Sequence, residues 1–209
     1  MIENIIFDIG NVLVSFRWRN LMKDLGFSPE TTEILGKNML MDPLWQEMDR
    51  GIMEEEEIVE EFKRKCPGYE REIELFHENR QQVIEEFSYT YGWIKGLKER
   101  GFKVYYLSNY PRSFFNSHVE KGFTFIPLMD GGVVSAFVKM VKPDHEIYQH
   151  LMDKYALKAE ECIFIDDTSK NIIAARELGM KGIIFKDLDN TQKELEDIIK
   201  KEGIINEGI

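Results

Sequence analysis

Four short apolar runs, each ending at polar residues, constrain the fold of this chain more than any other feature of its sequence. Nearly every position within a run is apolar, which is typical of strands that are buried on both faces of a sheet. The residues that follow each run are Asp, Ser, Asn, Lys or Thr, as expected where a strand enters a turn. The four predicted strands cover residues 4–7, 103–107, 162–165 and 182–185.

Helix-like stretches separate these runs, which determines how the strands can pair. Helical patterns cover residues 93–100, 144–155 and 171–178, and Gly101 and Gly179 follow two of them as plausible C-terminal caps. Strands that alternate with helices form βαβ units and hence a parallel sheet. The sequence therefore predicts an α/β fold with a Rossmann-like three-layer core, whose ligands bind beyond the carboxyl ends of the strands.

A long segment interrupts the alternation soon after the first predicted strand. Residues 18–87 show helical periodicity, are rich in Glu, Lys and Met, and contain no convincing strand. We expect a helical cap of residues 18–87, called the cap segment below. The core would then be built from residues 1–17 and 88–209, called the core segment.

Charge and composition exclude several classes of function. The chain has 27 Lys and Arg against 38 Asp and Glu, a formal net charge of −11, and no basic patch, so neither nucleic acid nor a membrane surface is an expected partner. No window approaches the ~18 apolar residues of a membrane span, so a cytoplasmic protein is expected. Cys66 and Cys162 lack metal-site spacing and are expected to be reduced thiols. Nothing in the sequence indicates the oligomeric state.

Two adjacent carboxylates, Asp166 and Asp167, follow the third predicted strand. The negative charges of two such neighbours repel each other unless a cation or good hydrogen-bond donors compensate them. Magnesium suits the pair because it takes oxygen ligands and commonly uses one or two carboxylates together with a substrate phosphate. Capping of the next helix by one of the two residues explains the pair equally well.

Three further polar segments could carry chemistry, although each alone has a structural explanation. Asp8 precedes Gly10 and Asn11 in one turn, where an Asp is commonly a turn or cap residue. Ser108 and Asn109 could bind phosphate oxygens or form a polar turn. Lys142 precedes Pro143 and could point into a crevice or remain solvated.

Taken together, these segments resemble the four motifs of the haloacid dehalogenase superfamily. The order is Asp, then Ser-Asn, then Lys-Pro, then Asp-Asp, and the resemblance extends over nearly the whole chain, including the cap segment. The sequence looks like the phosphatase branch that includes bacterial glucose-1-phosphate phosphatases and the amino-terminal domain of bifunctional epoxide hydrolases. The Gly-Asn of the first motif is similar to the sugar-phosphatase members. The matching segments are residues 7–14, 107–109, 141–144 and 164–167.

The resemblance implies magnesium-dependent hydrolysis of a small phosphorylated metabolite, with a sugar phosphate such as glucose-1-phosphate as first candidate. An aspartyl-phosphate intermediate would form on the nucleophile. The implied roles are Asp8 as nucleophile, Ser108 and Lys142 as catalytic ligands of the phosphoryl oxygens, Asn11 and Asn109 as substrate-binding residues, and Asp8, Gly10, Asp166 and Asp167 as ligands of Mg²⁺, with Asp166 acting directly or through water.

Gly10 departs from the family pattern, because most phosphatases of the superfamily carry a second Asp there as general acid and base. With Gly10 alone, turnover should favour leaving groups that are intrinsically acidic. Water or a cap residue such as Glu47 could instead supply the proton. Two other functions stay open: a haloacid dehalogenase, and a low-turnover phosphate-binding regulatory domain. The cap residues that could reach the leaving group are Trp45, Glu47, Asp49 and Arg50.

Overall fold

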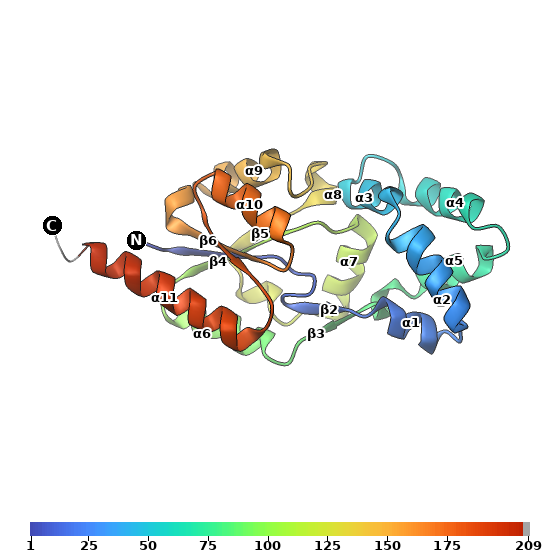
Figure 1. Cartoon of the computed structure of the whole chain (residues 1–209), viewed down its shortest axis with the longest axis horizontal. Coiled ribbons are helices and arrows are strands. Elements are labelled where there is room, and N and C mark those ends of the chain that lie inside the picture. Colours follow the sequence, from blue (N-terminus) through green and yellow to red (C-terminus); the bar gives the residue numbers. More distant parts are fainter. Residues whose placement is uncertain (207–209) are drawn as a thin grey trace.

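The computed structural model describes residues 1–206, with side chains through residue 202, and its centre is a five-stranded parallel sheet. The strand order is β5-β4-β1-β6-β7, so the first strand lies in the middle (Figure 1). This is the predicted α/β fold. The strands are β1 (Asn4–Phe7), β4 (Lys103–Ser108), β5 (Gly131–Val134), β6 (Cys162–Asp166) and β7 (Lys181–Ile184).

Helices cover both faces of the sheet because the central strands are apolar on both sides. Ile5 and Phe7 belong to one hydrophobic cluster, and Ile6 between them belongs to the other. The first cluster includes residues of α6 (Thr90–Glu99) and α11 (Leu188–Asn206), and the second includes residues of α9 (His145–Tyr155) and α10 (Ser169–Glu177). Figure 1 shows these two pairs of helices on opposite sides of the strands.

The cap segment forms a group of helices at the end of the molecule opposite the chain termini (Figure 1). A two-stranded antiparallel ribbon of β2 (Val14–Phe16) and β3 (Ile84–Glu86) joins it to the sheet. The expectation of no strand in residues 18–87 was therefore wrong for β3. That strand has three residues, too few to show a period in sequence. The helical elements are α1 (Trp18–Asp24), α2 (Pro29–Leu35), the π-helical stretch η1 (Gly36–Leu40), α3 (Pro43–Arg50), α4 (Glu55–Lys65), α5 (Glu70–Glu78) and the 3-10 turn η2 (Arg80–Gln82).

The remaining elements lie between β4 and β6. They are α7 (Arg112–Lys121), η3 (Ile126–Leu128), α8 (Ser135–Val138) and η4 (Ala159–Glu161). The edge strand β5 was not predicted, because Gly131 and Gly132 interrupt its apolar pattern. Gly132 pairs with Tyr106, and a methyl group at Gly132 would lie 2.4 Å from that tyrosine ring. The glycine is therefore a packing requirement of this sheet edge.

Several smaller predictions can be compared with the structure. The four predicted strands are present to within one residue, and Gly101 and Gly179 have positive φ angles of 91° and 95° after α6 and α10. Cys66 and Cys162 are buried and free. Within residues 1–206, no helix is both long enough and apolar enough to span a bilayer.

Candidate active site

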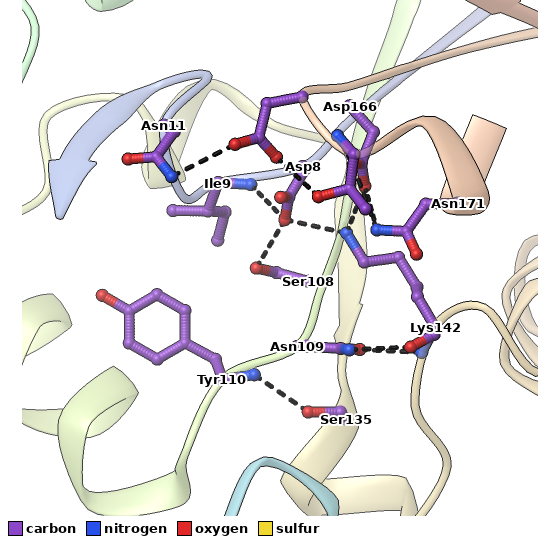
Figure 2. A network of polar contacts seen from close by, with 12 residues as sticks. Asp8, Ile9, Asn11, Ser108, Asn109, Tyr110, Ser135, Lys142, Asp166 and Asn171 are labelled. Carbon is purple, nitrogen blue, oxygen red and sulfur yellow. Dashed lines mark hydrogen bonds and ion pairs between the residues drawn. The ribbon is translucent and has the colours of Figure 1, made fainter. Parts of the chain in front are cut away.

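The predicted site residues meet at the carboxyl edge of the three central strands. Asp8 directly follows β1, Ser108 is the last residue of β4, and Asp166 is the last residue of β6. Because β4, β1 and β6 are adjacent and parallel, their ends deliver these side chains to one place. Lys142 enters the same place from the loop between α8 and α9 (Figure 2).

Three donors converge on one oxygen of Asp8. Its Oδ1 accepts hydrogen bonds from the backbone N–H of Ile9 at 2.7 Å and the hydroxyl of Ser108 at 2.8 Å, and lies 2.9 Å from Nζ of Lys142. The same ammonium donates to Oδ2 of Asp166 at 2.6 Å. One lysine therefore bridges two carboxylates, with its side chain only 1% exposed (Figure 2).

Asp166 is fixed by donors that the sequence did not reveal as functional. The backbone N–H of Thr168 donates to its Oδ1 at 2.7 Å, and the amide of Asn171 donates to both carboxylate oxygens at 3.0 Å. Asn171 lies in the first turn of α10, five positions after Asp166, so its side chain can reach back to the strand end. In the sequence, the signal that could have indicated this role was a polar Asn within the predicted helix. Asn171 thus orients Asp166.

Asp167 and Asn11 form a second layer nearer the surface. The amide of Asn11 donates to Oδ2 of Asp167 at 3.1 Å, and Thr168 donates its hydroxyl to Oδ1 at 3.1 Å. Asn11 adopts a φ of 55°, which Asn tolerates better than most residues. The turn after β1 is therefore tied to the turn after β6.

Oxygen atoms of Asp8, Asp166 and Asp167 lie within 4.8 Å of one another. Three carboxylates and one ammonium leave a formal charge of −2, which one divalent cation neutralises. All three carboxylates would offer hard oxygen ligands to a metal ion, and neither His nor Cys belongs to this group. The donor set therefore fits Mg²⁺ better than zinc.

Asn109 contacts the backbone of Lys142 in both directions. Its amide nitrogen donates to the Lys142 carbonyl at 3.0 Å, and its carbonyl oxygen accepts from the Lys142 N–H at 2.8 Å. These bonds fix the loop that aims the lysine at Asp8. The predicted contact of Asn109 with substrate stays a prediction, while its positioning of Lys142 is seen directly (Figure 2).

Burial and charge act in opposite directions on the central ion pair. The pKa of Asp8 is raised to about 6, chiefly by burial and also by the charge of Asp166, while Lys142 acts to lower it. Burial would lower the pKa of Lys142, but the two carboxylates outweigh it and hold the pKa above its ordinary value. The lysine is therefore a permanent cation beside Asp8.

A cavity of about 210 Å³ opens above Asp8, between the core segment and the cap segment. Its floor is polar and includes Gly10, Asn109 and Asp167 in addition to Asp8. Its walls are largely apolar and contain no Lys or Arg. The apolar and aromatic wall residues are Val14, Phe16, Trp45, Val83, Ile84, Tyr110, Pro111 and Phe114.

Two of the four candidate cap residues line this cavity. Trp45 and Asp49 are four positions apart on α3 and so share a helix face, which is the face turned to the cavity. Glu47 and Arg50 are not among the lining residues. Arg50 lies 3.4 Å from Asp144 and links the cap segment to the core segment.

Fold and site together define a doubly wound α/β protein with an aspartate and lysine centre at the carboxyl end of its sheet. Residues 2–179 match the family model of haloacid dehalogenase-like hydrolases. The chain therefore belongs to the haloacid dehalogenase-like hydrolases, and the resemblance seen in the four motifs is confirmed.

Individual proteins are similar to this chain at modest sequence identity. A sesquiterpene phosphatase of Aspergillus oryzae is 28% identical over 200 residues, covering 93% of this chain and 95% of the relative. A flavin mononucleotide hydrolase of Arabidopsis thaliana is 27% identical, covering 74% of this chain and 62% of the relative. A HAD family enzyme of Bacteroides thetaiotaomicron, solved with magnesium and inorganic phosphate, has a TM-score of 0.73 at 20% identity, covering 91% and 98% of the two chains.

Proposed function

We propose that this chain is a magnesium-dependent phosphatase that hydrolyses a small phosphorylated metabolite through an aspartyl-phosphate on Asp8. The observation that carries the proposal is the Asp8 carboxylate, which is paired with the Lys142 ammonium and lies beside two further carboxylates that suit a divalent cation. The names of the Aspergillus and Arabidopsis relatives support phosphate ester hydrolysis. The magnesium and phosphate bound by the Bacteroides enzyme support the cofactor.

The chemistry requires a carboxylate to attack a phosphate that is itself negatively charged. A bond forms between Oδ of Asp8 and phosphorus while the bond from phosphorus to the leaving oxygen breaks. Lys142 opposes the repulsion and stabilises the charge that spreads over the phosphoryl oxygens, and the Ser108 hydroxyl offers them a donor. Magnesium held by Asp8, Asp166, Asp167 and the Gly10 carbonyl would supply further positive charge. Water then attacks phosphorus and releases the Asp8 carboxylate.

The cap segment completes this proposal. We propose that residues 18–87 close over the site, exclude water and contact the leaving group, as lids of many enzymes do. The cavity between the two segments and the position of Trp45 and Asp49 in its wall support that role.

A haloacid dehalogenase is the main alternative, since that branch uses the same nucleophile without metal. The group of three carboxylates argues against it, because uncompensated carboxylates would repel an anionic haloacid. Hydrolysis of phosphate esters and of 2-haloacids, each measured with magnesium and with a chelator, separates the two functions. Halide release that persists with chelator would favour the dehalogenase.

We expect removal of magnesium to abolish activity and Asp167→Asn to raise the magnesium concentration for half-maximal activity by ~10- to 100-fold. Asp167 is only half-buried, so the variant should fold. Titration of activity with magnesium after chelation measures the effect. Asp189→Asn, an exposed carboxyl on α11, is the matched control and should behave as wild type. Full activity of the chelated enzyme would contradict the cofactor.

We propose two candidate substrate classes. Glucose-1-phosphate or a related sugar phosphate is the first candidate, because the anomeric oxygen leaves more easily than that of a primary alkyl phosphate. The apolar wall favours a second class, phosphate esters of apolar or aromatic alcohols. The values of kcat/KM for glucose-1-phosphate, glucose-6-phosphate, an isoprenyl phosphate and an aryl phosphate would decide between them.

A further inference from the structure

The leaving oxygen of an alkyl phosphate needs a proton, and Gly10 in the turn after β1 cannot supply one. Gly10 has no side chain where most phosphatases of the superfamily carry an acid. If the proposed phosphatase function holds, a side chain that supplies this proton is one of the other groups that line the cavity above Asp8. Apart from the nucleophile itself, the titratable side chains in that lining are Asp49, Tyr110, His118 and Asp167.

Tyr110 and His118 are engaged with each other and with the backbone. The Tyr110 hydroxyl lies 2.8 Å from Nδ1 of His118, and Nε2 of His118 lies 2.8 Å from the carbonyl of Arg80. The carbonyl only accepts, so Nε2 carries the proton and Nδ1 accepts from the tyrosine. Burial lowers the pKa of His118 to about 4 and raises that of Tyr110 far above its ordinary value. Neither group is therefore a suitable proton donor at neutral pH.

Asp167 is not a suitable proton donor either. It accepts hydrogen bonds from Asn11 and Thr168, and it belongs to the group of three carboxylates that suits magnesium. Asp49 remains. None of the side-chain hydrogen bonds found in residues 1–202 involves its carboxyl group, although the residue is partly buried at the cavity wall.

The backbone at Asp49 is fixed against the core segment. The Ser135 hydroxyl donates to the Asp49 carbonyl and accepts from the N–H of Tyr110 at 2.9 Å, so one serine joins α3 to the turn after β4. Two residues later, Gly51 has a φ of 68°, and a methyl group there would lie 2.6 Å from the carbonyl oxygen of Ala136. This close approach places the end of α3 directly over α8.

We propose that Asp49 of the cap segment is the general acid and base of the reaction, in place of the side chain that Gly10 lacks. In the first step, Asp49 gives its proton to the leaving oxygen as the bond from that oxygen to phosphorus breaks. In the second step, the Asp49 carboxylate takes a proton from the attacking water as the bond from phosphorus to Asp8 breaks. Each turnover returns Asp49 to its protonated form and Asp8 to its carboxylate.

The protonation state of Asp49 suits this role. The pKa of Asp49 is raised to about 8, chiefly by burial and also by the charge of Asp8, while Lys142 opposes the rise. Tyr110 also faces Asp49 and is neutral, while the neighbouring Arg50 pairs with Asp144. Asp49 therefore carries a proton at neutral pH, and activity that needs this proton falls as the pH rises through about 8.

Gly10 offers a direct way to test the replacement. A side chain built at Gly10 would meet no atom within 4 Å of its Cβ, and its φ is not in the left-handed region. An aspartate can therefore be installed there. Gly10→Asp restores the acid two residues after the nucleophile and should rescue a chain that lacks Asp49.

The experiment compares wild type, Asp49→Asn and the double variant Gly10→Asp/Asp49→Asn on an alkyl phosphate and on 4-nitrophenyl phosphate. We expect Asp49→Asn to lower kcat/KM by ~10²- to 10⁴-fold for the alkyl ester, whose leaving group needs a proton. The loss should be below ~10-fold for the nitrophenyl ester, and the decline above about pH 8 should disappear. The double variant should regain activity on the alkyl ester.

Equal losses on both esters, or no rescue by Gly10→Asp, would overturn the assignment, since Asp49 would then be merely structural. Glu47→Gln, on the same helix but outside the cavity lining, is the control and should match wild type. Exchange of ¹⁸O between water and inorganic phosphate supplies a second measurement that needs no known substrate. Exchange that persists at the wild-type rate in Asp49→Asn would refute the role, whereas a wild type without either hydrolysis or exchange would refute the phosphatase function itself.

Discussion

Asp8→Asn is expected to reduce kcat by ~10⁴-fold or more, because the amide cannot attack phosphorus and no other group occupies its position. The fold should survive the change. The asparagine oxygen can still accept from Ile9 and Ser108, and Lys142 keeps its ion pair with Asp166. Single-turnover assays with a radiolabelled phosphate ester measure both hydrolysis and protein-bound phosphate.

Wild type should trap acid-stable, base-labile phosphate on the chain, and Asp8→Asn should trap none. A matched thermal unfolding profile for the two proteins provides the control for folding. Labelling that persists in the variant would place the nucleophile elsewhere and remove the basis of the mechanism.

Lys142→Met is expected to lower the free energy of unfolding by about 3–5 kcal/mol, because it leaves two buried carboxylates without their shared cation. The side chains of Asp8 and Asp166 are 12% and 0% exposed, so water cannot replace the ammonium. Urea unfolding in the presence of chelator measures the loss. Lys170→Met, an exposed lysine on α10, is the control and should change stability by less than ~0.5 kcal/mol.

The loss should depend on pH in a defined direction. The folded-state pKa of Asp8 is already raised to about 6, above its ordinary value, so the folded chain binds a proton more readily than the unfolded chain. Removing Lys142 removes an influence that lowers this pKa, so it should rise further. The stability of the variant should therefore fall more steeply than that of wild type as the pH rises from about 4 to 7. A deficit that is equal at both ends of this range would contradict the picture of an uncompensated buried carboxylate.

The central part of the site could be predicted because parallel strands that lie side by side end at the same edge. Asp8, Ser108 and Asp166 each end an apolar run, so identifying the runs was enough to bring them together. Lys142 followed from its Lys-Pro context and the family resemblance. The structure places all four within one network of hydrogen bonds and ion pairs.

Other parts depend on tertiary contacts that leave little trace in sequence. The strands β3 and β5 are short, and β5 begins with two glycines whose reason is the Tyr106 ring beside them. Asn171 is one polar residue in a predicted helix, and its bond to Asp166 depends on how α10 docks. Glu47 was the cap residue named from the sequence as a possible proton source, and only the orientation of α3 shows that Asp49, not Glu47, lines the cavity.

The Ser135 contact with the Asp49 carbonyl has a consequence for the order of events in one turnover. In the proposed mechanism, the nucleophile Asp8 belongs to the core segment and the proton donor Asp49 to the cap segment, so the distance between them depends on the position of α3 and not on a two-residue turn. If this hydrogen bond breaks and α3 moves away after the first product leaves, the phosphorylated enzyme loses the base that would activate water. The aspartyl-phosphate should then persist until α3 returns. The lifetime of the aspartyl-phosphate should therefore report how often the hydrogen bond between Ser135 and Asp49 breaks. In Gly10→Asp, where the turn after β1 carries its own base, this lifetime should no longer depend on that hydrogen bond.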